Sequence, residues 1–424
     1  MDRPGHRNSG IGFREFVLLA AAMLSVQALA VDAMLPALPN IVHEFGVRNA
    51  NHGQWIVTAY LVGIGLGQLF WGIMSDRFGR RPVLLCGLTL YVLAAVLCGL
   101  AGSFQALLSW RLLHGLAASS VVITRSAVRD LYVGRTMARV MSLTFVVFLM
   151  VPILAPSLGQ FILMLGHWRI IFIVFAAFAT LIALWALLRL PETLHVEYRL
   201  TLSAAHIGRA LATVLGTRTS ICYTLANTVM FGSLVAYVGM VQQIFAVVFH
   251  RASWMPGMFA LCAIFMGLAS FLNSRIVERL GMRRISHTAL LTYIGVTALH
   301  LLIALAGLER LWTFVALQAA TMAFFSLSVS NFGAMAMEPL AAIAGIGAAT
   351  QGLLTTCGGA VIGAVIGSQF RDSTAPLAGG ALLVGLLSLS FVLLAERGQL
   401  FRAHHATALA APDPASALEQ LSGP

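Results

Sequence analysis

Apolar runs of about 20 residues recur along most of this 424-residue sequence, and a helix of that length spans the hydrocarbon core of a bilayer. A transmembrane strand would instead alternate polar and apolar residues. The composition agrees with the helical interpretation, because 59% of residues are hydrophobic and only 10% are charged. A soluble chain of this length cannot bury so much apolar surface, so we predict an all-α membrane protein.

The apolar runs form two sets of six around one polar connector. We predict twelve transmembrane helices at approximately 15–36, 54–74, 82–102, 106–128, 139–165, 168–190, 219–246, 254–274, 286–307, 310–333, 341–368 and 375–395. The chain then divides into an N-terminal segment, a six-helix bundle, a linker, a second six-helix bundle and a tail expected to be disordered, at 1–14, 15–190, 191–218, 219–395 and 396–424. A signal peptide ending at Ala30 is the alternative for the first run, but the run continues past that site.

Arginine residues are distributed unevenly between the connecting segments. With the N-terminus inside the cell, 19 arginines fall in cytoplasmic segments and 5 in outer segments. Short cytoplasmic loops carry an excess of basic residues, so both termini are predicted to be cytoplasmic. The net charge of +11 then reflects membrane topology and not nucleic-acid binding. We expect the protein in a bacterial inner membrane.

A short charged stretch at 72–81 lies between the second and third apolar runs. Its sequence at 76–81, Asp-Arg-Phe-Gly-Arg-Arg, has a degenerate echo at 278–284, Glu-Arg-Leu-Gly-Met-Arg-Arg, after the second run of the other half. Parallel six-helix repeats are typical of one class of secondary transporter, whose substrate site lies between the halves. The echo therefore predicts a duplicated transporter.

These motifs resemble those of the major facilitator superfamily. The charged stretch resembles the family motif between helices two and three, Arg111 to Gly115 resembles the fourth-helix motif with His114 in place of the usual Gln, and the stretch from Asp32 to Pro39 resembles the first-helix end of the drug:proton antiporters. The closest resemblance is to the bicyclomycin/chloramphenicol-type efflux group. The fifth-helix antiporter motif is only partly matched, and its candidate residues are Pro152, Pro156 and Gly159.

Three ionisable residues in predicted spans are candidates for proton coupling or substrate binding. Asp32 is the acid expected in the membrane, where a lone carboxylate costs several kcal/mol and is a functional candidate by default. Arg111 cannot release its proton in practice, but it can tune a carboxylate or hold a polar group. Arg125 lies 14 residues further on, in the cytoplasmic half of the same span. The alternatives are a solvated Asp32 near the outer mouth and arginines that reach the interface.

The charged stretch is interpreted as a gate latch. We expect its acid to pair with arginines or to cap a neighbouring helix when the cytoplasmic side is closed, and basic topology alone would not explain the acid or the glycines. The candidate residues are Gly72, Asp76, Arg77, Gly79, Arg80 and Arg81. Polar and amphipathic residues in the spans are candidate cavity lining, namely Gln54, Tyr60, His114, Asn227, Tyr237 and Gln242.

The sequence contains no Walker A loop, GxGxxG, HExxH or GxSxG motif, so neither ATP drive nor a membrane enzyme is expected. Its five cysteines are isolated, and no metal site or other cofactor is expected. The resemblance implies a monomeric exporter of small amphipathic compounds driven by the proton gradient, with the bilayer, protons and substrate as its partners. A metabolite permease of the same fold and a non-transporting receptor or scaffold remain alternatives.

Overall fold

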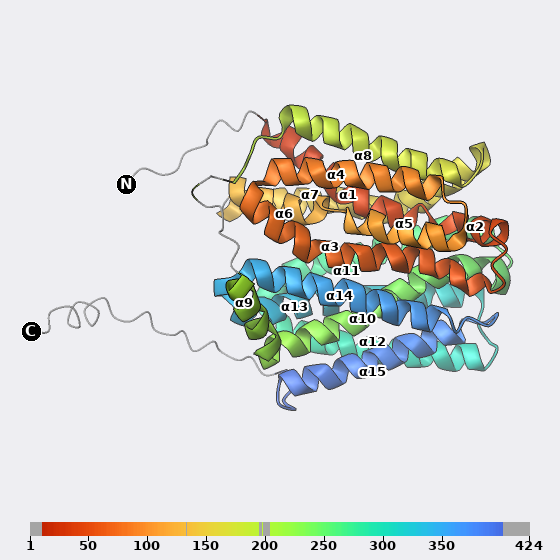
Figure 1. Ribbon diagram of the computed structural model, residues 1–424. Coiled ribbons are helices and arrows are strands. Elements are labelled where there is room, and N and C mark those ends of the chain that lie inside the picture. Colours follow the sequence, from red (N-terminus) through yellow and green to blue (C-terminus); the bar gives the residue numbers. More distant parts are fainter. Residues whose placement is uncertain (1–10, 133, 195–196, 198–203, 402–424) are drawn as a thin grey trace, which may run out of the picture.

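The computed structural model describes residues 11–132, 134–194, 197 and 204–401, and its regular structure is entirely helical (Figure 1). The first half contains α1 (Phe13–Asp32), α2 (Leu38–Glu44), α3 (Gln54–Phe78), α4 (Arg80–Gly99), α5 (Phe104–Leu116), α6 (Ser120–Leu131), α7 (Gly134–Leu165) and α8 (Arg169–Arg189). The second half contains α10 (Arg218–Gln243), α11 (Met255–Leu280), α12 (Met282–Leu305), α13 (Leu311–Met337), α14 (Ala344–Gly367) and α15 (Ala375–Ala395). Helix α9 (Ala204–Gly216) lies in the linker between them.

Eleven helical segments of the described chain are long and apolar enough to cross a bilayer. The 32-residue α7 occupies the position of the remaining predicted span, which gives the twelve-helix arrangement expected from the sequence. The start of α1 and the end of α15 lie at the same end of the molecule, as an even number of spans requires (Figure 1). Following the arginine distribution, we call this the inner end, and the opposite end, which carries α2, the outer end.

Large apolar side chains cover the outside of the bundle. Leu188 is 77% exposed, Leu100 is 75% exposed and Met164 is 80% exposed. The interior instead holds aromatic and small residues such as Phe172 and Ala179, both fully buried. Such an exterior would drive aggregation in water but is well solvated by lipid chains, so the packing agrees with a membrane-spanning bundle.

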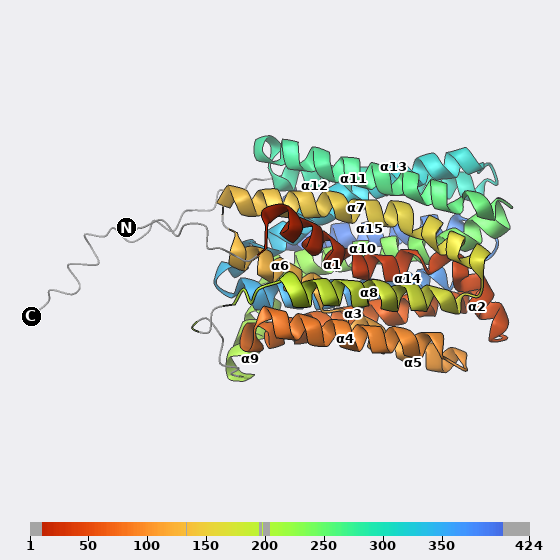
Figure 2. The same ribbon diagram turned by 90° about the horizontal axis from the view of Figure 1, so that it is seen from above.

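The two halves lie side by side, as Figures 1 and 2 show. Helix α3 of the first half packs along α14 of the second, and α7 packs along α11. Close approach at the α3–α14 pair depends on small residues, since a Cβ at Gly65 would lie 2.4 Å from Cys357 Sγ. The site expected between the halves is therefore bounded by these two helix pairs.

The predicted fourth span, 106–128, is not one continuous helix. Helix α5 ends at Leu116 and α6 begins at Ser120, with a break at 117–119. The carbonyl of Leu116, freed by the break, accepts a hydrogen bond from the Trp71 indole N–H at 2.6 Å. A broken helix is stable at membrane depth only where protein groups satisfy its backbone, and Trp71 supplies part of that need.

The charged stretch at 72–81 is also more helical than expected. Helix α3 continues to Phe78, four residues beyond the predicted end of its span, and α4 begins at Arg80. Gly79 alone separates the two helices, with φ +103°, a conformation that favours glycine. Asp76 and Arg77 are therefore the last turn of α3 and are not part of a loop.

Candidate functional site

Asp32 is the last residue of α1 and is only 6% exposed. Among the described residues its carboxylate has no hydrogen-bond or ion-pair partner. The chain next enters a short 3-10 turn with Pro36 at its second position, so α1 ends at the acid. The structure thus places an uncompensated carboxyl group at a helix end inside the membrane bundle, the arrangement that marks functional ionisable groups in membrane proteins.

The fifth-helix motif lies directly against this helix end. A Cβ at Gly159 of α7 would lie 2.1 Å from the carbonyl oxygen of Ala33, the residue that follows Asp32. Pro152 and Pro156 lie inside α7, where each removes a backbone donor from the helix. The glycine of this motif is therefore required for the close approach of α7 to the end of α1.

Arg111 is fully buried in α5 and is held by backbone carbonyls. Its Nη2 donates to the Ala30 carbonyl of α1 at 3.0 Å, and its Nε donates to the Ile56 carbonyl of α3 at 3.2 Å. Its guanidinium carbon lies 4.2 Å from the centre of the Tyr60 ring. The arginine joins α5 to α1 and α3 through charge-assisted hydrogen bonds and a cation–π contact.

His114 lies one turn after Arg111 and is also fully buried. Arg111 Nη1 lies 3.2 Å from His114 Nδ1, and because a guanidinium only donates, Nδ1 must be the acceptor of a neutral imidazole. The His114 ring packs 4.0 Å from the ring of Tyr91 and 5.2 Å from that of Tyr60, centre to centre. Tyr60 and His114, both predicted to line a cavity, are fully buried within the first half in this conformation, and their place in a cavity stays a prediction.

Arg111 was expected to tune a carboxylate or hold a polar group, and in this structure it makes no direct contact with the Asp32 side chain. Arg111 contacts Ala30, two residues before the acid, but no ion pair joins the two side chains in the described residues. The reason is geometric: the guanidinium is already occupied by two carbonyls and a histidine. Arg111 contributes to the placement of α1, and hence of Asp32, through the backbone.

Arg125 lies in α6, whose first residue, Ser120, follows the break in the fourth span. The Arg125 side chain is exposed and has no ion pair in the described part of the chain. Five residues of helix place it about 8 Å from the break, within the membrane part of the bundle. Its role in substrate binding stays a prediction.

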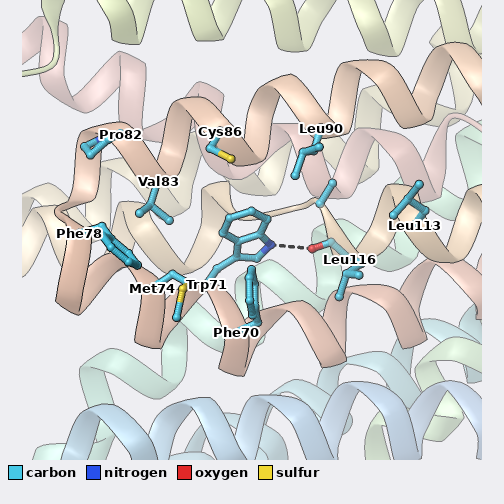
Figure 3. Close-up of a pocket in the computed structure, with 11 residues that line it drawn as sticks. Phe70, Trp71, Met74, Phe78, Pro82, Val83, Cys86, Leu90, Leu113 and Leu116 are labelled. Atoms are coloured by element: carbon cyan, nitrogen blue, oxygen red, sulfur yellow. Dashed lines mark hydrogen bonds between the residues drawn. The ribbon is translucent and has the colours of Figure 1, made fainter. Parts of the chain in front are cut away.

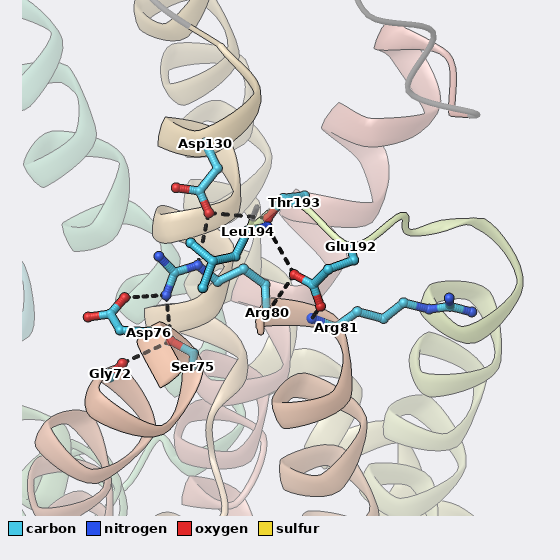
Figure 4. A network of polar contacts seen from close by, with 9 residues as sticks. All are labelled: Gly72, Ser75, Asp76, Arg80, Arg81, Asp130, Glu192, Thr193 and Leu194. Carbon is cyan, nitrogen blue, oxygen red and sulfur yellow. Dashed lines mark hydrogen bonds and ion pairs between the residues drawn. The ribbon is translucent and has the colours of Figure 1, made fainter. Parts of the chain in front are cut away.

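The candidate gate motif forms an ionic network at the inner end of the first half (Figure 4). Arg80 is only 2% exposed, and its guanidinium pairs with Asp76 and, at 2.8 Å, with Asp130 at the end of α6. It also donates to Ser75 Oγ at 2.8 Å. Gly72, one turn earlier, packs 3.7 Å from Val122 of α6, measured from an added Cβ.

Glu192, which follows α8, caps the start of α4. Its two carboxylate oxygens accept from the backbone N–H groups of Arg80 at 2.8 Å and Arg81 at 3.2 Å. An acid at a helix N-terminus satisfies free donors and complements the helix dipole. A Cβ at Gly79 would lie 2.5 Å from Glu192 Oε2, so this position requires glycine for lack of space as well as for its positive φ. The network therefore joins α3, α4, α6 and the end of α8 within one half.

The second half contains an equivalent network built from other residues. Arg283, at the start of α12, pairs with Glu396 after α15 at 2.8 Å and with Glu338 after α13 at 3.3 Å. Glu396 is 3% exposed and also accepts from Tyr223 Oη at 2.6 Å. Arg283 aligns with Arg81 in the repeat but makes ion pairs as Arg80 does, and Glu338 and Glu396 occupy places similar to those of Asp130 and Glu192.

Hydrogen bonds join the two halves at the outer end. Gln54, at the start of α3, donates to the Gly367 carbonyl of α14 at 3.1 Å, and Asn51 Nδ2 donates to the carbonyls of Ser368 and Phe370 at 3.1 and 3.0 Å. Gln243 of α10 donates to Asn51 Oδ1 at 3.1 Å. Gln54 was expected to line a cavity, but it is buried in this contact, and the outer end is closed.

The comparisons with known proteins agree with this geometry. The Major Facilitator Superfamily model matches residues 20–368. The chain belongs to the major facilitator superfamily. Its relatives include a bicyclomycin resistance protein homolog of Haemophilus influenzae, 28% identical over 397 residues, 89% of this chain and 96% of that protein. The multidrug resistance protein MdtL of Klebsiella pneumoniae is 26% identical over 386 residues, 89% of this chain and 95% of that protein.

A chloramphenicol resistance protein of Pseudomonas aeruginosa is 39% identical over 158 residues, 37% of this chain and 38% of that protein. These relatives confirm the predicted resemblance to the bicyclomycin/chloramphenicol-type efflux group. Among solved structures, a D-xylose–proton symporter superposes with a TM-score of 0.71 at 15% identity, covering 91% of this chain and 98% of that chain. The human organic anion transporter MFSD10 gives 0.64 at 22% identity, covering 91% and 99%. These structural matches confirm the superfamily fold.

Three residues of the second half were also expected to line the superfamily's central cavity. Tyr237 is 2% exposed and stacks on Phe259, with 5.6 Å between ring centres. Asn227 and Gln242 are half-buried, and each has a side-chain oxygen without a hydrogen-bond partner in the described structure. Asn227 and Gln242 stay candidates for contact with a substrate or water, whereas Tyr237 is part of the packing between α10 and α11.

Sequence reasoning missed the second ionic network and the outer contact. A signal for the network was present, since an acid follows the last span of each half, as Leu190-Pro-Glu192 and Leu394-Ala-Glu396. The outer contact had no such signal, because Asn51 and Gln243 are ordinary polar residues at span ends, and Asn51 donates to backbone carbonyls.

Proposed function

We propose that this chain is a proton-coupled exporter of small amphipathic compounds that operates by alternating access in a bacterial inner membrane. Superfamily membership and the named resistance proteins among its relatives support export of drug-like compounds. The inner-membrane location and action as a monomer without a cofactor are part of the same proposal. The proton gradient supplies the energy.

The observation that carries the coupling mechanism is the isolated carboxyl group of Asp32. A buried carboxylate without a counter-ion is costly, and either a bound proton or a positively polarised group of the substrate removes that cost. Proton and substrate then compete for one site. When the halves rock, the side chain exchanges one occupant for the other, which is the minimum requirement for antiport.

The test is transport by the Asp32→Asn variant in proteoliposomes. The wild type is expected to move chloramphenicol or bicyclomycin against its gradient when a pH difference is imposed, and to stop when an uncoupler removes that difference. An amide cannot exchange a proton, so pH-driven transport by Asp32→Asn is expected to be lost.

Asp372→Asn is the matched control, because it makes the same chemical change at an exposed residue outside the spans. It is expected to transport as the wild type does. Undiminished pH-driven transport by Asp32→Asn would exclude the coupling role. Failure of the wild type to move either compound, with uptake of a sugar or organic acid instead, would exclude the exporter.

A further inference from the structure

An apolar groove lies on the first half between α3, α4 and α5, outside the region between the halves (Figure 3). Its volume is about 520 Å³, within the range of about 300–1,000 Å³ that is typical of small-molecule sites. Phe70, Trp71 and Phe78 of α3 form one wall, and Cys86 and residues near it on α4 form another. Its eleven lining residues are all apolar or cysteine, so it suits a hydrocarbon chain.

The groove opens toward the position of the lipid. Phe70 and Phe78 are each 50% exposed and Leu90 is 43% exposed, because no helix of the described structure covers them. The groove extends along α4 from Pro82 to Leu90, eight residues, or about 12 Å. It begins at the inner end of the bundle and reaches toward the break in the fourth span, which is the course of an acyl chain in the inner leaflet.

A free positive charge marks the inner end of the groove. Arg77 is exposed, and its guanidinium carbon lies 5.1 Å from the centre of the Phe78 ring that lines the groove. Unlike Arg80, it has no ion pair in the described residues, because the neighbouring Asp76 is engaged by Arg80. An exposed arginine at this depth attracts anionic headgroups.

We propose that this groove binds an acyl chain of an anionic phospholipid of the inner leaflet, whose headgroup phosphate lies on Arg77. The chain lies along Phe78, Cys86 and Leu90 and contacts Trp71, whose indole N–H holds the Leu116 carbonyl at the end of α5. The bound lipid therefore supports the broken fourth helix from the membrane side. This site is separate from Asp32 and does not depend on the proposed transport function.

The test is lipid retention by the purified full-length protein, measured by native mass spectrometry. Phosphatidylglycerol and phosphatidylcholine with identical acyl chains are added separately. One basic contact at a membrane surface corresponds to about fivefold in affinity, so the wild type is expected to retain phosphatidylglycerol about fivefold better. Arg77→Gln is expected to remove that preference.

Arg279→Gln is the matched control, because Arg279 is the repeat equivalent of Arg77 at the end of α11 and does not line the groove. It is expected to keep the preference. Cys86→Trp fills the groove and is expected to reduce retention of both lipids. A second measurement needs no bulky variant, because Cys86 is the one exposed cysteine of the five. Its labelling by N-ethylmaleimide is measured in nanodiscs. Phosphatidylglycerol is expected to slow this labelling in the wild type but not in Arg77→Gln.

Several results would overturn the proposal. Equal retention of the two lipids by the wild type would show that headgroup charge plays no role. An equal loss of the phosphatidylglycerol preference in Arg77→Gln and Arg279→Gln would show that the preference comes from general surface electrostatics and not from this groove. Protection of Cys86 by chloramphenicol in place of phosphatidylglycerol would assign the groove to a transported compound.

Discussion

Arg111 illustrates how a membrane protein holds a buried charge without a carboxylate. Its guanidinium is shared between two backbone carbonyls, one histidine nitrogen and one aromatic face. Carbonyl dipoles of α1 and α3 compensate the charge and at the same time fix the spacing of three helices. The planar fork of arginine suits this arrangement, because its donors point in several fixed directions.

Arg111→Lys is expected to lower the unfolding temperature in detergent. A lysine amine cannot reach the Ala30 and Ile56 carbonyls together, and a carbonyl left without a donor in a buried site costs about 1–3 kcal/mol. The measurement is thermal unfolding of purified protein. Arg48→Lys, at an exposed outer position, is the control and is expected to unfold as the wild type does. An unchanged unfolding temperature in Arg111→Lys would show that these contacts do not stabilise the fold.

Asp32 and Arg111 also show what residue types alone predict. An acid or an arginine inside an apolar run is conspicuous in the sequence, since its transfer into lipid is costly. The partners of Arg111 are not conspicuous, because backbone carbonyls have no sequence signature. Hence the candidates were found from the sequence, whereas the groups that surround them were not.

At the scale of elements, the two halves carry a similar ionic arrangement at their inner ends. In the first half the Arg80 side chain pairs with Asp130 and its backbone N–H donates to Glu192, whereas in the second half the Arg283 side chain pairs with both Glu338 and Glu396. The echo at 278–284 predicted the repeat but suggested Glu278 as the equivalent of Asp76. Glu278 is exposed, and Arg283 uses Glu338 and Glu396 instead.

Asp76→Asn is expected to impair transport more than Glu278→Gln. The first change weakens a pair with the buried Arg80, and a loss of about 1–2 kcal/mol changes a conformational equilibrium roughly tenfold. The second alters an exposed side chain without an ion pair in the described residues. The measurement is the initial rate of substrate efflux at equal expression. Equal rates in the two variants would contradict a dominant role for the first-half network.

The broken fourth span is a further result at this scale. The residues at the break are Ala117, Ala118 and Ser119, without proline or glycine, so local propensity does not predict it. The hydrogen bond from Trp71 and the close packing of Gly87, where a Cβ would lie 2.0 Å from Ser119 Oγ, stabilise it from neighbouring helices. Tertiary contacts outweigh helix propensity here.

At the scale of the whole molecule, the structure is a transporter with its outer end closed. Asn51, Gln54 and Gln243 hydrogen-bond across the halves at that end, and α3 packs closely on α14 below them. The charged network around Arg80 lies within one half. The latch expected from the sequence therefore organises its own half in this conformation, and the contacts that join the halves are uncharged.

Removal of the outer hydrogen bonds is expected to favour opening toward the outside. In a background without native cysteines, a cysteine at Thr58, buried one turn below Gln54, reports access from the outer side. The Asn51→Ala, Gln54→Ala pair removes at least four hydrogen bonds across the halves, each worth about 1 kcal/mol, so it is expected to raise labelling by a membrane-impermeant thiol reagent by at least about tenfold.

Gln369→Ala is the control for this experiment, because its amide bonds only to the neighbouring Ser368. Its labelling is expected to match that of the parent. If the Asn51 and Gln54 changes leave the labelling unaltered, the uncharged contacts do not hold the outer end closed.

The sequence by itself determined the membrane class, the twelve spans, the division into halves, the superfamily and the most conspicuous charged residues. The membrane class and the spans follow from transfer free energies, which depend on each segment's own composition, and the superfamily follows from short motifs. The tertiary structure alone decided that Arg111 binds carbonyls, that the fourth span is broken, that the second half has its own ionic network and that the outer end is closed. Each of these depends on contacts between residues far apart in the chain, and a sequence pattern does not reveal which residues meet.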